Sequence, residues 1–254
     1  MRTNPNQTKM PNPAVRFYEW KGSKGVFQYY DKENKINVEA PKNFAFIVLD
    51  ELSTIKGFNQ QTQLSLYSNE VRNLKTQKLI VKYHKGNELI EGYYNDIKEF
   101  IKGKGGKFCK SVYIAIKEGK ELQIANIQFV GSGFDGWMRF LEKSKNELYT
   151  GIVELTGSVQ EKNGATIYQV PTFAMRPIAP ATDQAAGTLQ KQLETYLEEY
   201  FKNVGQGDVA NYDRDELDMQ PPPDTLFVDD KTSEEIEQQL KAEGKIDETD
   251  DLPF

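Results

Sequence analysis

Aromatic and basic side chains share one face of a predicted strand over residues 15–20. An extended strand points alternate side chains to opposite faces, so every second residue here contributes to one surface. Aromatic rings can stack on unpaired nucleic-acid bases while cations neutralise the phosphates, and stacking contributes about 1–3 kcal/mol per base with little dependence on sequence. The candidate residues are Arg16, Tyr18 and Trp20 on that face, with Lys21 and Lys24 in the turn that follows.

Residues 78–84 carry a second basic face. Lys78, Lys82 and His84 share one side of this predicted strand, opposite three apolar side chains. Tyr30, at the end of a predicted strand over residues 26–30, is a further candidate. For any single aromatic residue, packing in the core or at the surface is the more common use of the ring. The two faces therefore indicate a class of ligand, single-stranded nucleic acid, more firmly than they indicate individual contacts.

The loop at residues 102–107 reads Lys-Gly-Lys-Gly-Gly-Lys and could approach a phosphate closely. Lys104 and Lys107 supply positive charge, and the glycines leave backbone amides accessible. The loop lacks the Gly-x-x-x-x-Gly-Lys-Ser/Thr spacing of a nucleotide-binding P-loop. Two interpretations stay open, a flexible connection and a clamp on a nucleic-acid backbone.

Residues 131–136 match the pattern Gly-x-Gly-x-x-Gly between a predicted strand and a predicted helix. In a dinucleotide-binding fold this pattern belongs to alternating strand–helix–strand units. The flanking segments here predict antiparallel hairpins instead. We therefore interpret the glycines as a tight strand-to-helix turn, with Asp135 favourable to the helix N-terminus.

Catalytic and metal chemistry have little support in the residue types. Cys109 is the only cysteine and His84 the only histidine, which excludes an internal disulfide and a zinc site built from these residues alone. Asp50 and Glu51 are sequence neighbours that we expect at the surface, solvated and not catalytic. We expect a non-enzymatic protein with no cofactor and no metal, in which Cys109 is a buried structural residue.

The last five residues place two carboxylates before an apolar Leu-Pro-Phe. They are Asp250, Asp251, Leu252, Pro253 and Phe254. The final residue combines a ring with a free carboxylate. Because the segment before it is acidic and contains prolines, we expect no apolar core of the chain itself to bury that ring. We expect a pocket on a partner protein to bind it.

The net charge of −6 divides unevenly along the chain. Residues 205–254 contain 16 acidic and 4 basic residues, a net charge of −12, whereas residues 1–204 contain 22 acidic and 28 basic residues, a net charge of +6. A basic body attracts phosphate backbones, and a flexible acidic tail can compete for the same surface at low salt. The alternative is that the acidic tail only increases solubility.

Period-two patterns and turn residues predict a mainly β body from residue 15 to residue 178. Asn163-Gly164 is the strongest hairpin signal. Because hairpin connections dominate, we expect a barrel or sandwich and no parallel doubly wound sheet. The predicted strands are 15–20, 26–30, 36–39, 44–49, 63–67, 78–83, 108–117, 121–130, 151–160 and 166–175.

Three helices are predicted, over residues 94–101, 134–141 and 188–201. The last of them is amphipathic and should close the domain against the β core. The predicted organisation is a flexible arm over residues 1–14, a folded domain over 15–204 and a disordered acidic tail over 205–254 with its tip at 250–254. The absence of a long apolar run, of a signal-peptide pattern and of paired cysteines predicts a cytoplasmic protein with no membrane contact.

Asp-Asp-Leu-Pro-Phe resembles the C-terminal tip of bacterial single-stranded DNA-binding proteins, which reads Asp-Asp-Ile/Leu-Pro-Phe. The basic β body, closing helix and acidic tail resemble the same family in architecture, in a bacterial or phage form. The resemblance implies an elaborated oligonucleotide-binding (OB) barrel. It also implies a tip that docks replication, recombination and repair proteins. The two aspartates would meet basic residues of the partner, Phe254 would fill an apolar pocket, and its carboxylate would pair with an arginine.

The body of this chain is nearly twice the length usual for bacterial members of that family. It has extra strands and helices, and its tail lacks the common Gly/Gln richness. These departures favour a phage or mobile-element protein. Because of them, the resemblance does not transfer the family's base-stacking positions or its tetrameric state to this chain. A homo-oligomer stays an open alternative.

We expect sequence-independent binding of single-stranded DNA, with partner recruitment through the tip. One alternative is a recruitment adaptor that uses the tip and does not bind DNA. Another is a nucleotide-using or nucleolytic enzyme, for which the glycines at residues 131–136 are the only indication.

Overall fold

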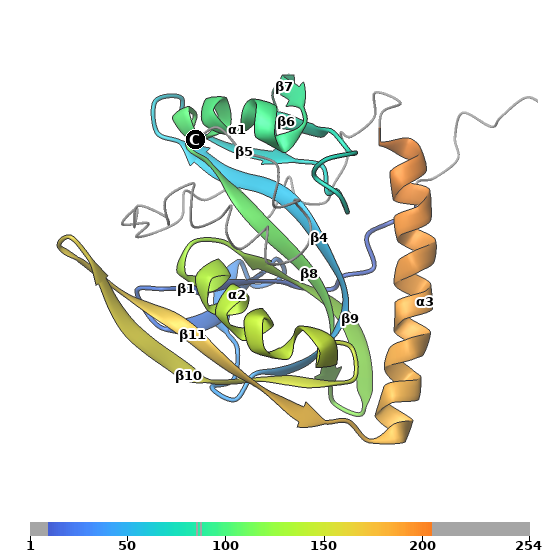
Figure 1. The fold of residues 1–254 in the computed structure, drawn as a ribbon. Coiled ribbons are helices and arrows are strands. Elements are labelled where there is room, and N and C mark those ends of the chain that lie inside the picture. Colours follow the sequence, from blue (N-terminus) through green and yellow to red (C-terminus); the bar gives the residue numbers. More distant parts are fainter. Residues whose placement is uncertain (1–9, 85, 87, 205–254) are drawn as a thin grey trace, which may run out of the picture.

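The computed structural model describes residues 10–84, 86 and 88–204. The predicted acidic tail at 205–254, its tip at 250–254 and most of the predicted N-terminal arm lie outside the described residues. The described part of the chain is mainly β, as the sequence predicts, and it ends in a long helix (Figure 1).

A long strand, β4 (Ala45–Asn59), runs through the middle of the molecule and connects its parts (Figure 1). One edge of β4 pairs antiparallel with β8 (Gly106–Glu118) over almost its whole length. The other edge pairs with β10 (Gly151–Asn163) near the beginning of β4 and with β5 (Leu64–Ser68) near its end. On its second edge β4 therefore belongs to two separate groups of strands, one that continues through β10 and one that continues through β5.

The sheet is open within the described residues. All its neighbours are antiparallel except β1 and β9, and β11 (Thr166–Pro177) forms a long hairpin with β10. The end strands β3 and β7 do not pair with each other, so closure into the predicted barrel is not observed. From one end to the other the strands are β3 (Ile36–Glu39), β2 (Val26–Asp31), β1 (Phe17–Lys21), β9 (Glu121–Phe129), β8, β4, β5, β6 (Leu79–Tyr83) and β7 (Glu88–Gly92).

The three predicted helices are present, and each is longer than its apolar pattern indicated. They are α1 (Tyr94–Gly103), α2 (Ser132–Ser144) and α3 (Pro180–Asn203), and a short 3-10 turn, Lys145–Glu147, follows α2. α3 begins with a proline, whose fixed φ suits the first helical turn and whose missing N–H costs no hydrogen bond there. The apolar pattern misses the first two turns of α3, because their residues are small or polar and only Ala186 among them is buried against the sheet.

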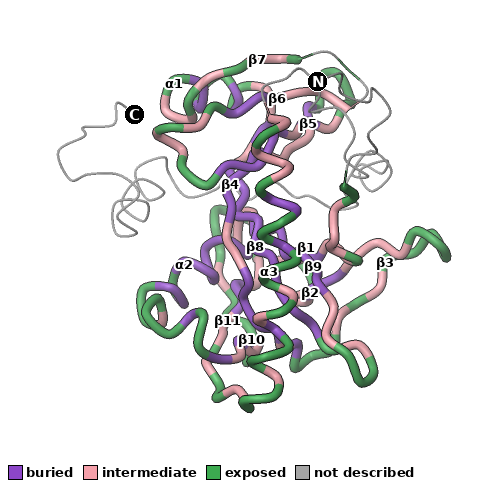
Figure 2. The backbone as a smooth tube through the Cα atoms, turned by 90° about the vertical axis from the view of Figure 1, so that its right-hand side faces the viewer, coloured by how far each residue is buried: buried purple, intermediate pink, exposed green. Residues whose placement is uncertain are grey.

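Strand register assigns the side chains of the sheet to two faces. We call the face that packs on α1, α2 and the β10–β11 hairpin the inner face, and the opposite face the α3 face. In Figure 2 the buried positions follow the central strands, whereas α3 is buried along one side only. The inner face has two apolar cores, one beneath α2 and one beneath α1, and the α3 face has one, so the sheet is a shared wall between them.

The larger core of the inner face, beneath α2, is rich in aromatic rings. Trp137 of α2 is fully buried and stacks on Phe129 of β9, with ring centroids 4.7 Å apart. Its indole N–H donates to a carboxylate oxygen of Glu51 at 3.0 Å, which satisfies the one polar group of the side chain. Phe173 of β11 packs edge-on against both rings. α2 is therefore fixed to the sheet by ring packing and one hydrogen bond.

The glycines at residues 131–136 allow α2 to approach its neighbours. A Cβ atom at Gly133 would lie 2.8 Å from Cβ of Trp20, and one at Gly136 would lie 2.4 Å from the carbonyl oxygen of Pro171. Gly131 has φ +55° at the sharp entry to the helix. These contacts support the structural interpretation of the Gly-x-Gly-x-x-Gly pattern.

Residues 50–59 of β4 and the whole of β7 were not among the predicted strands. Asp50 and Glu51 interrupt the apolar pattern, and the register shifts between Val48 and Asp50. The carboxylates are not simply solvated, because Asp50 pairs with Arg72 at 2.7 Å and Glu51 accepts the Trp137 indole hydrogen. β7 is a short edge strand that pairs only with β6 within the described residues.

Candidate nucleic-acid interface

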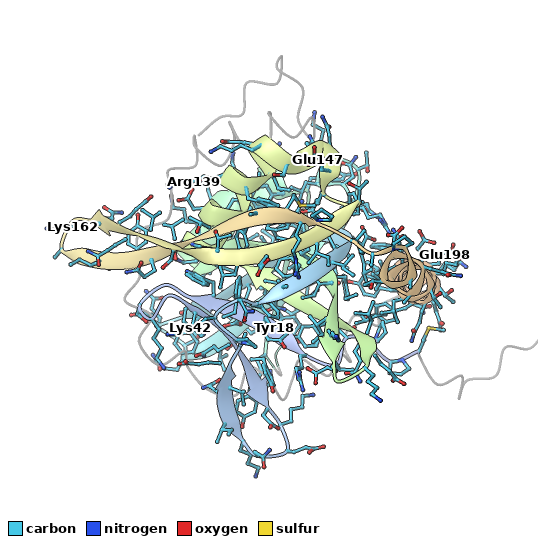
Figure 3. All side chains as sticks on the ribbon, turned by 90° about the horizontal axis from the view of Figure 1, so that it is seen from below. Tyr18, Lys42, Arg139, Glu147, Lys162 and Glu198 are labelled. Atoms are coloured by element: carbon cyan, nitrogen blue, oxygen red, sulfur yellow. The ribbon has the colours of Figure 1, made fainter. Side chains whose placement is uncertain are left out.

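Tyr18 and Trp20 lie in the aromatic core and not on an open surface. They are 3% and 7% exposed, and the Trp20 indole N–H donates to the carbonyl oxygen of Gln169 at 2.8 Å. Burial raises the pKa of the Tyr18 hydroxyl, although Arg16 opposes that shift. Seen from below, Tyr18 lies among packed side chains near the β1–β2 strands (Figure 3). The prediction that these two rings face a ligand is wrong, because the face of β1 that carries them is the buried one.

Other predicted basic residues are scattered around the molecule. Arg16 pairs with Glu118 and lies over the Tyr29 ring, 4.7 Å from its centroid. The pairs Lys24–Glu39, at 3.6 Å, and Lys78–Glu91, at 3.0 Å, lie on different hairpins. Lys104 lies over the ring of Phe100 at 5.7 Å, and Tyr30 is half-buried in β2. The structure does not bring these five predicted residues together into one site.

A row of three lysines and one tyrosine crosses four neighbouring strands on the α3 face. Lys107 of β8 is paired in register with Lys56 of β4, Lys56 with Tyr67 of β5, and Tyr67 with Lys82 of β6. Paired residues point to the same face, and neighbouring strands lie about 4.8 Å apart. All four side chains are half-buried. We call Lys107, Lys56, Tyr67 and Lys82 the basic row.

A carboxylate of β1 joins the basic row to Lys21. One oxygen of Glu19 contacts the ammonium group of Lys56, and the other accepts a hydrogen bond from Lys21 at 2.9 Å. The Lys56 ammonium also donates to the side-chain oxygen of Gln128 on β9 at 2.9 Å. Because β8 lies between β4 and β9, the Lys56 side chain extends across β8 to reach these partners. Lysines from two distant strands therefore converge on one anion.

The electrostatics of this cluster favour the ionised carboxylate. Burial by itself would raise the pKa of Glu19, but Lys56 and Lys21 outweigh it and hold the pKa well below the ordinary value of a glutamate. At neutral pH the cluster of Lys21, Lys56 and Glu19 therefore carries one net positive charge.

α3 covers the other end of this face. Its apolar side packs on the first half of β4, including Leu52, and on Tyr113 of β8. The Tyr200 hydroxyl accepts a hydrogen bond from the backbone N–H of Glu70 at 2.7 Å and so fixes the last turn of the helix. Lys56 lies four residues beyond Leu52 along β4, about 13 Å further at the rise of an extended strand. The basic row thus begins where the described part of α3 ends.

A buried polar network lies between the part of the sheet that α3 covers and the basic row. Glu70 is 1% exposed, and its carboxylate accepts hydrogen bonds from Ser111 at 2.5 Å and from the Tyr113 hydroxyl at 2.9 Å. Asn126 donates to the Ser111 hydroxyl at 2.8 Å. A buried carboxylate is costly unless hydrogen bonds satisfy it, and here strand β8 supplies them. The network ties the β5–β6 connection to the central strands.

The glycine-rich loop before β8 packs tightly against β4. A Cβ atom at Gly57 would lie 2.1 Å from the carbonyl oxygen of Gly105, and Gly105 has φ +85°. The backbone N–H of Phe58 donates to the same carbonyl oxygen at 3.2 Å. These contacts explain the two glycines without a bound phosphate, and they place Lys107 at the start of β8 beside Lys56.

Lys56 and Tyr67 were not among the predicted site residues. Both lie in segments whose own sequence shows no basic face, and only the pairing of β4 with β5 and β8 brings them into the row. Of the predicted residues, Lys82 and Lys107 lie in the row and Lys21 joins it through Glu19. The sequence did contain a signal for the open face of β1, because the charged residues Glu19 and Lys21 alternate there with the buried rings of Tyr18 and Trp20.

Among residues 10–84, 86 and 88–204, no cluster of three or more histidine, cysteine, aspartate or glutamate residues is placed to hold a metal ion. In the same part of the chain, no helix is long and apolar enough to cross a membrane. No protein-family model, no curated protein and no solved structure matches the chain.

Proposed function

We propose that the protein binds single-stranded DNA without sequence preference and uses the α3 face of its sheet, at the basic row, to do so. The row is the observation that carries the proposal. Tyr67 lies between Lys56 of β4 on one side and Lys82 of β6 on the other. A ring at this position can stack on a base while the lysines neutralise the flanking phosphates. No hydrogen-bonding pattern for a particular base is needed.

The proposal includes an OB-type body, which the contacts around the inner core support. β4 pairs with β8 on one edge and β10 on the other, and α2 connects β9 to β10. The N–H of Gln169 in β11 donates to the carbonyl oxygen of Gly22 at 2.8 Å, so the β1–β2 turn bridges the remaining gap. In OB folds the face of the second and third strands binds oligonucleotides. The corresponding strands here would be β8 and β9, which carry Lys107 and Gln128 on the α3 face.

Partner recruitment through residues 250–254 is the second part of the proposal. It depends on the resemblance of Asp-Asp-Leu-Pro-Phe to the tip of bacterial single-stranded DNA-binding proteins, whose replication and recombination partners bind that motif. The acidic residues 205–254 follow α3 directly, and the last turn of α3 is fixed near the basic row by Tyr200. We infer that the acidic segment competes with DNA for this face.

Titration of a fluorescent oligo-dT by anisotropy tests the proposal. The association constant should fall with salt, and log K should change by about −0.7 per decade of salt for each phosphate neutralised. A chain that ends at Gly205 should bind more tightly than the full chain, with the largest difference at low salt. Absence of binding at low salt for both chains would contradict DNA binding and leave the adaptor. Equal affinities at low salt would refute only the competition.

A further inference from the structure

We propose that Lys21 and Lys56 form a phosphate-binding position that the Glu19 carboxylate fills in the free protein. The inference rests on the proposed function, because the phosphate would be that of a bound single strand. Glu19 is thus an internal competitor that a DNA phosphate must displace.

The geometry around Glu19 is that of an occupied anion site. The two carboxylate oxygens contact different lysines, which come from β1 and from β4. Lys56 has to extend across β8 to make this contact, and Gln128 holds its ammonium group from a third strand at 2.9 Å. An ordinary surface ion pair joins one acid to one base and contributes little to stability. Here Lys21 of β1 and Lys56 of β4 converge on one anion, Gln128 of β9 accepts a hydrogen bond from the Lys56 ammonium, and a phosphate oxygen can use the same two lysine donors.

Glu19 can leave this position without disturbing the core. Its side chain remains 31% exposed, and it lies on the α3 face of β1, opposite the buried rings of Tyr18 and Trp20. Rotation of the side chain toward solvent would release both ammonium groups from the carboxylate while the backbone of β1 stays paired with β2 and β9. The position also continues the basic row, because Lys56 belongs to both. A strand stacked on Tyr67 would therefore bring its next phosphate toward Glu19.

The low pKa of the Glu19 carboxyl shows how strongly the two lysines favour an anion at this place. A phosphate diester is ionised throughout the neutral range, so it would receive the same stabilisation. Glu19 keeps the lysines extended in the free protein and lowers the net charge of the face by one. We therefore expect Glu19 to weaken the binding of DNA while it keeps the two lysine side chains in position for a phosphate.

Replacement of Glu19 by Gln tests the inference in the full chain. The amide has the shape of the carboxylate but not its charge, so the contribution of this phosphate contact is no longer offset by the loss of the Glu19 ion pairs. We expect log K for oligo-dT to change more steeply with salt by about 0.7 per decade, and affinity at 0.1 M salt to rise about fivefold. Glu154→Gln is the matched control, because Glu154 has the same 31% exposed side chain and pairs with Arg176 at 3.4 Å on the β10–β11 hairpin. That control should change affinity less than about twofold.

A measurement on the unmodified chain separates displacement from general repulsion and does not depend on how the variant folds. The side-chain carboxylate carbon of Glu19, followed by NMR, should shift as oligo-dT saturates the protein, whereas that of Glu154 should not. Unchanged or weaker binding by Glu19→Gln, or a Glu19 signal that does not move at saturation, would overturn the inference while leaving the proposed function intact. If the unmodified chain does not bind oligo-dT at low salt, the proposed function and this inference fail together.

Discussion

Neutralising the two outer lysines of the basic row should weaken DNA binding in a salt-dependent way. Lys82 and Lys107 lie on β6 and β8, on either side of Lys56 and Tyr67. If each neutralises one phosphate, the double variant Lys82→Gln/Lys107→Gln loses two of the contacts that release counterions. The salt dependence of log K should then become shallower by about 1.4 per decade, since each contact on a single strand contributes about 0.7.

The same relation gives the size of the effect. If the electrostatic contribution vanishes near 1 M salt, each lost contact weakens binding about fivefold at 0.1 M and about twofold at 0.3 M. The double variant should therefore bind about 25-fold more weakly at 0.1 M salt but only about fivefold more weakly at 0.3 M. Anisotropy titrations with oligo-dT at several salt concentrations measure both quantities. The change in slope is the sharper readout, because misfolding would not convert a steep salt dependence into a shallow one.

Lys117→Gln/Lys120→Gln provides a control with the same change in net charge. Both lysines are exposed at the β8–β9 turn, and Lys117 lies ten residues from Lys107 along β8, about 33 Å at the rise of an extended strand. This control should leave the slope unchanged. Equal losses in the two double variants would show that binding follows net charge and not the row, and would refute the placement of the site.

Three further outcomes follow from the structure. Tyr67→Ala should weaken oligo-dT binding by about 1–3 kcal/mol, whereas Tyr67→Phe should not, because stacking needs only the ring; equal losses in both would show that the hydroxyl matters. Gly136→Ala should lower the free energy of unfolding in urea by about 1–3 kcal/mol, because its Cβ would meet the Pro171 carbonyl oxygen; an unchanged midpoint would contradict that packing. Because the folded state lowers the pKa of Glu19, the ionised carboxylate adds to the free energy of unfolding above the ordinary glutamate pKa of 4.5. This contribution is lost as the pH falls from 4.5 toward the pKa of the folded state. Glu19→Gln should thus flatten the fall in thermal stability below about pH 4.5, and an unchanged acid limb would refute that contribution.

Local sequence patterns predicted most of the elements because their physical causes are local. The strand Ile36–Glu39 has its predicted bounds, and the hairpin of β10 and β11 turns at Asn163-Gly164, with φ +58° at the glycine. Apolar spacing also located the helices. The extension of β4 could not be predicted in this way, because Asp50 and Glu51 are stabilised there by Arg72 and Trp137, which lie far away in the sequence.

The candidate site depends on pairing between strands, which local patterns do not encode. Lys56 follows the uncharged Leu52–Ile55 segment, and Tyr67 ends a segment with no neighbouring charge. Each is unremarkable in its own strand. They become neighbours only because β4 pairs with β5 in one particular register, and a shift of that register by one residue would place Tyr67 on the inner face.

The two faces of β1 show which sequence signal should decide between core and interface. A ring can stack on a base or on another ring, so aromatic alternation in residues 16–20 indicates a shared face without indicating whether that face is open. Charge is more discriminating, because an ionised side chain needs water or a paired partner. Glu19 and Lys21 therefore mark the open face, and Tyr18 and Trp20 must occupy the other. Lys110, only 2% exposed on the inner face, shows that one lysine alone is not a sufficient indicator. The acid and the base together, two residues apart in the same strand, are what identify the α3 face of β1 as the side available to a charged ligand.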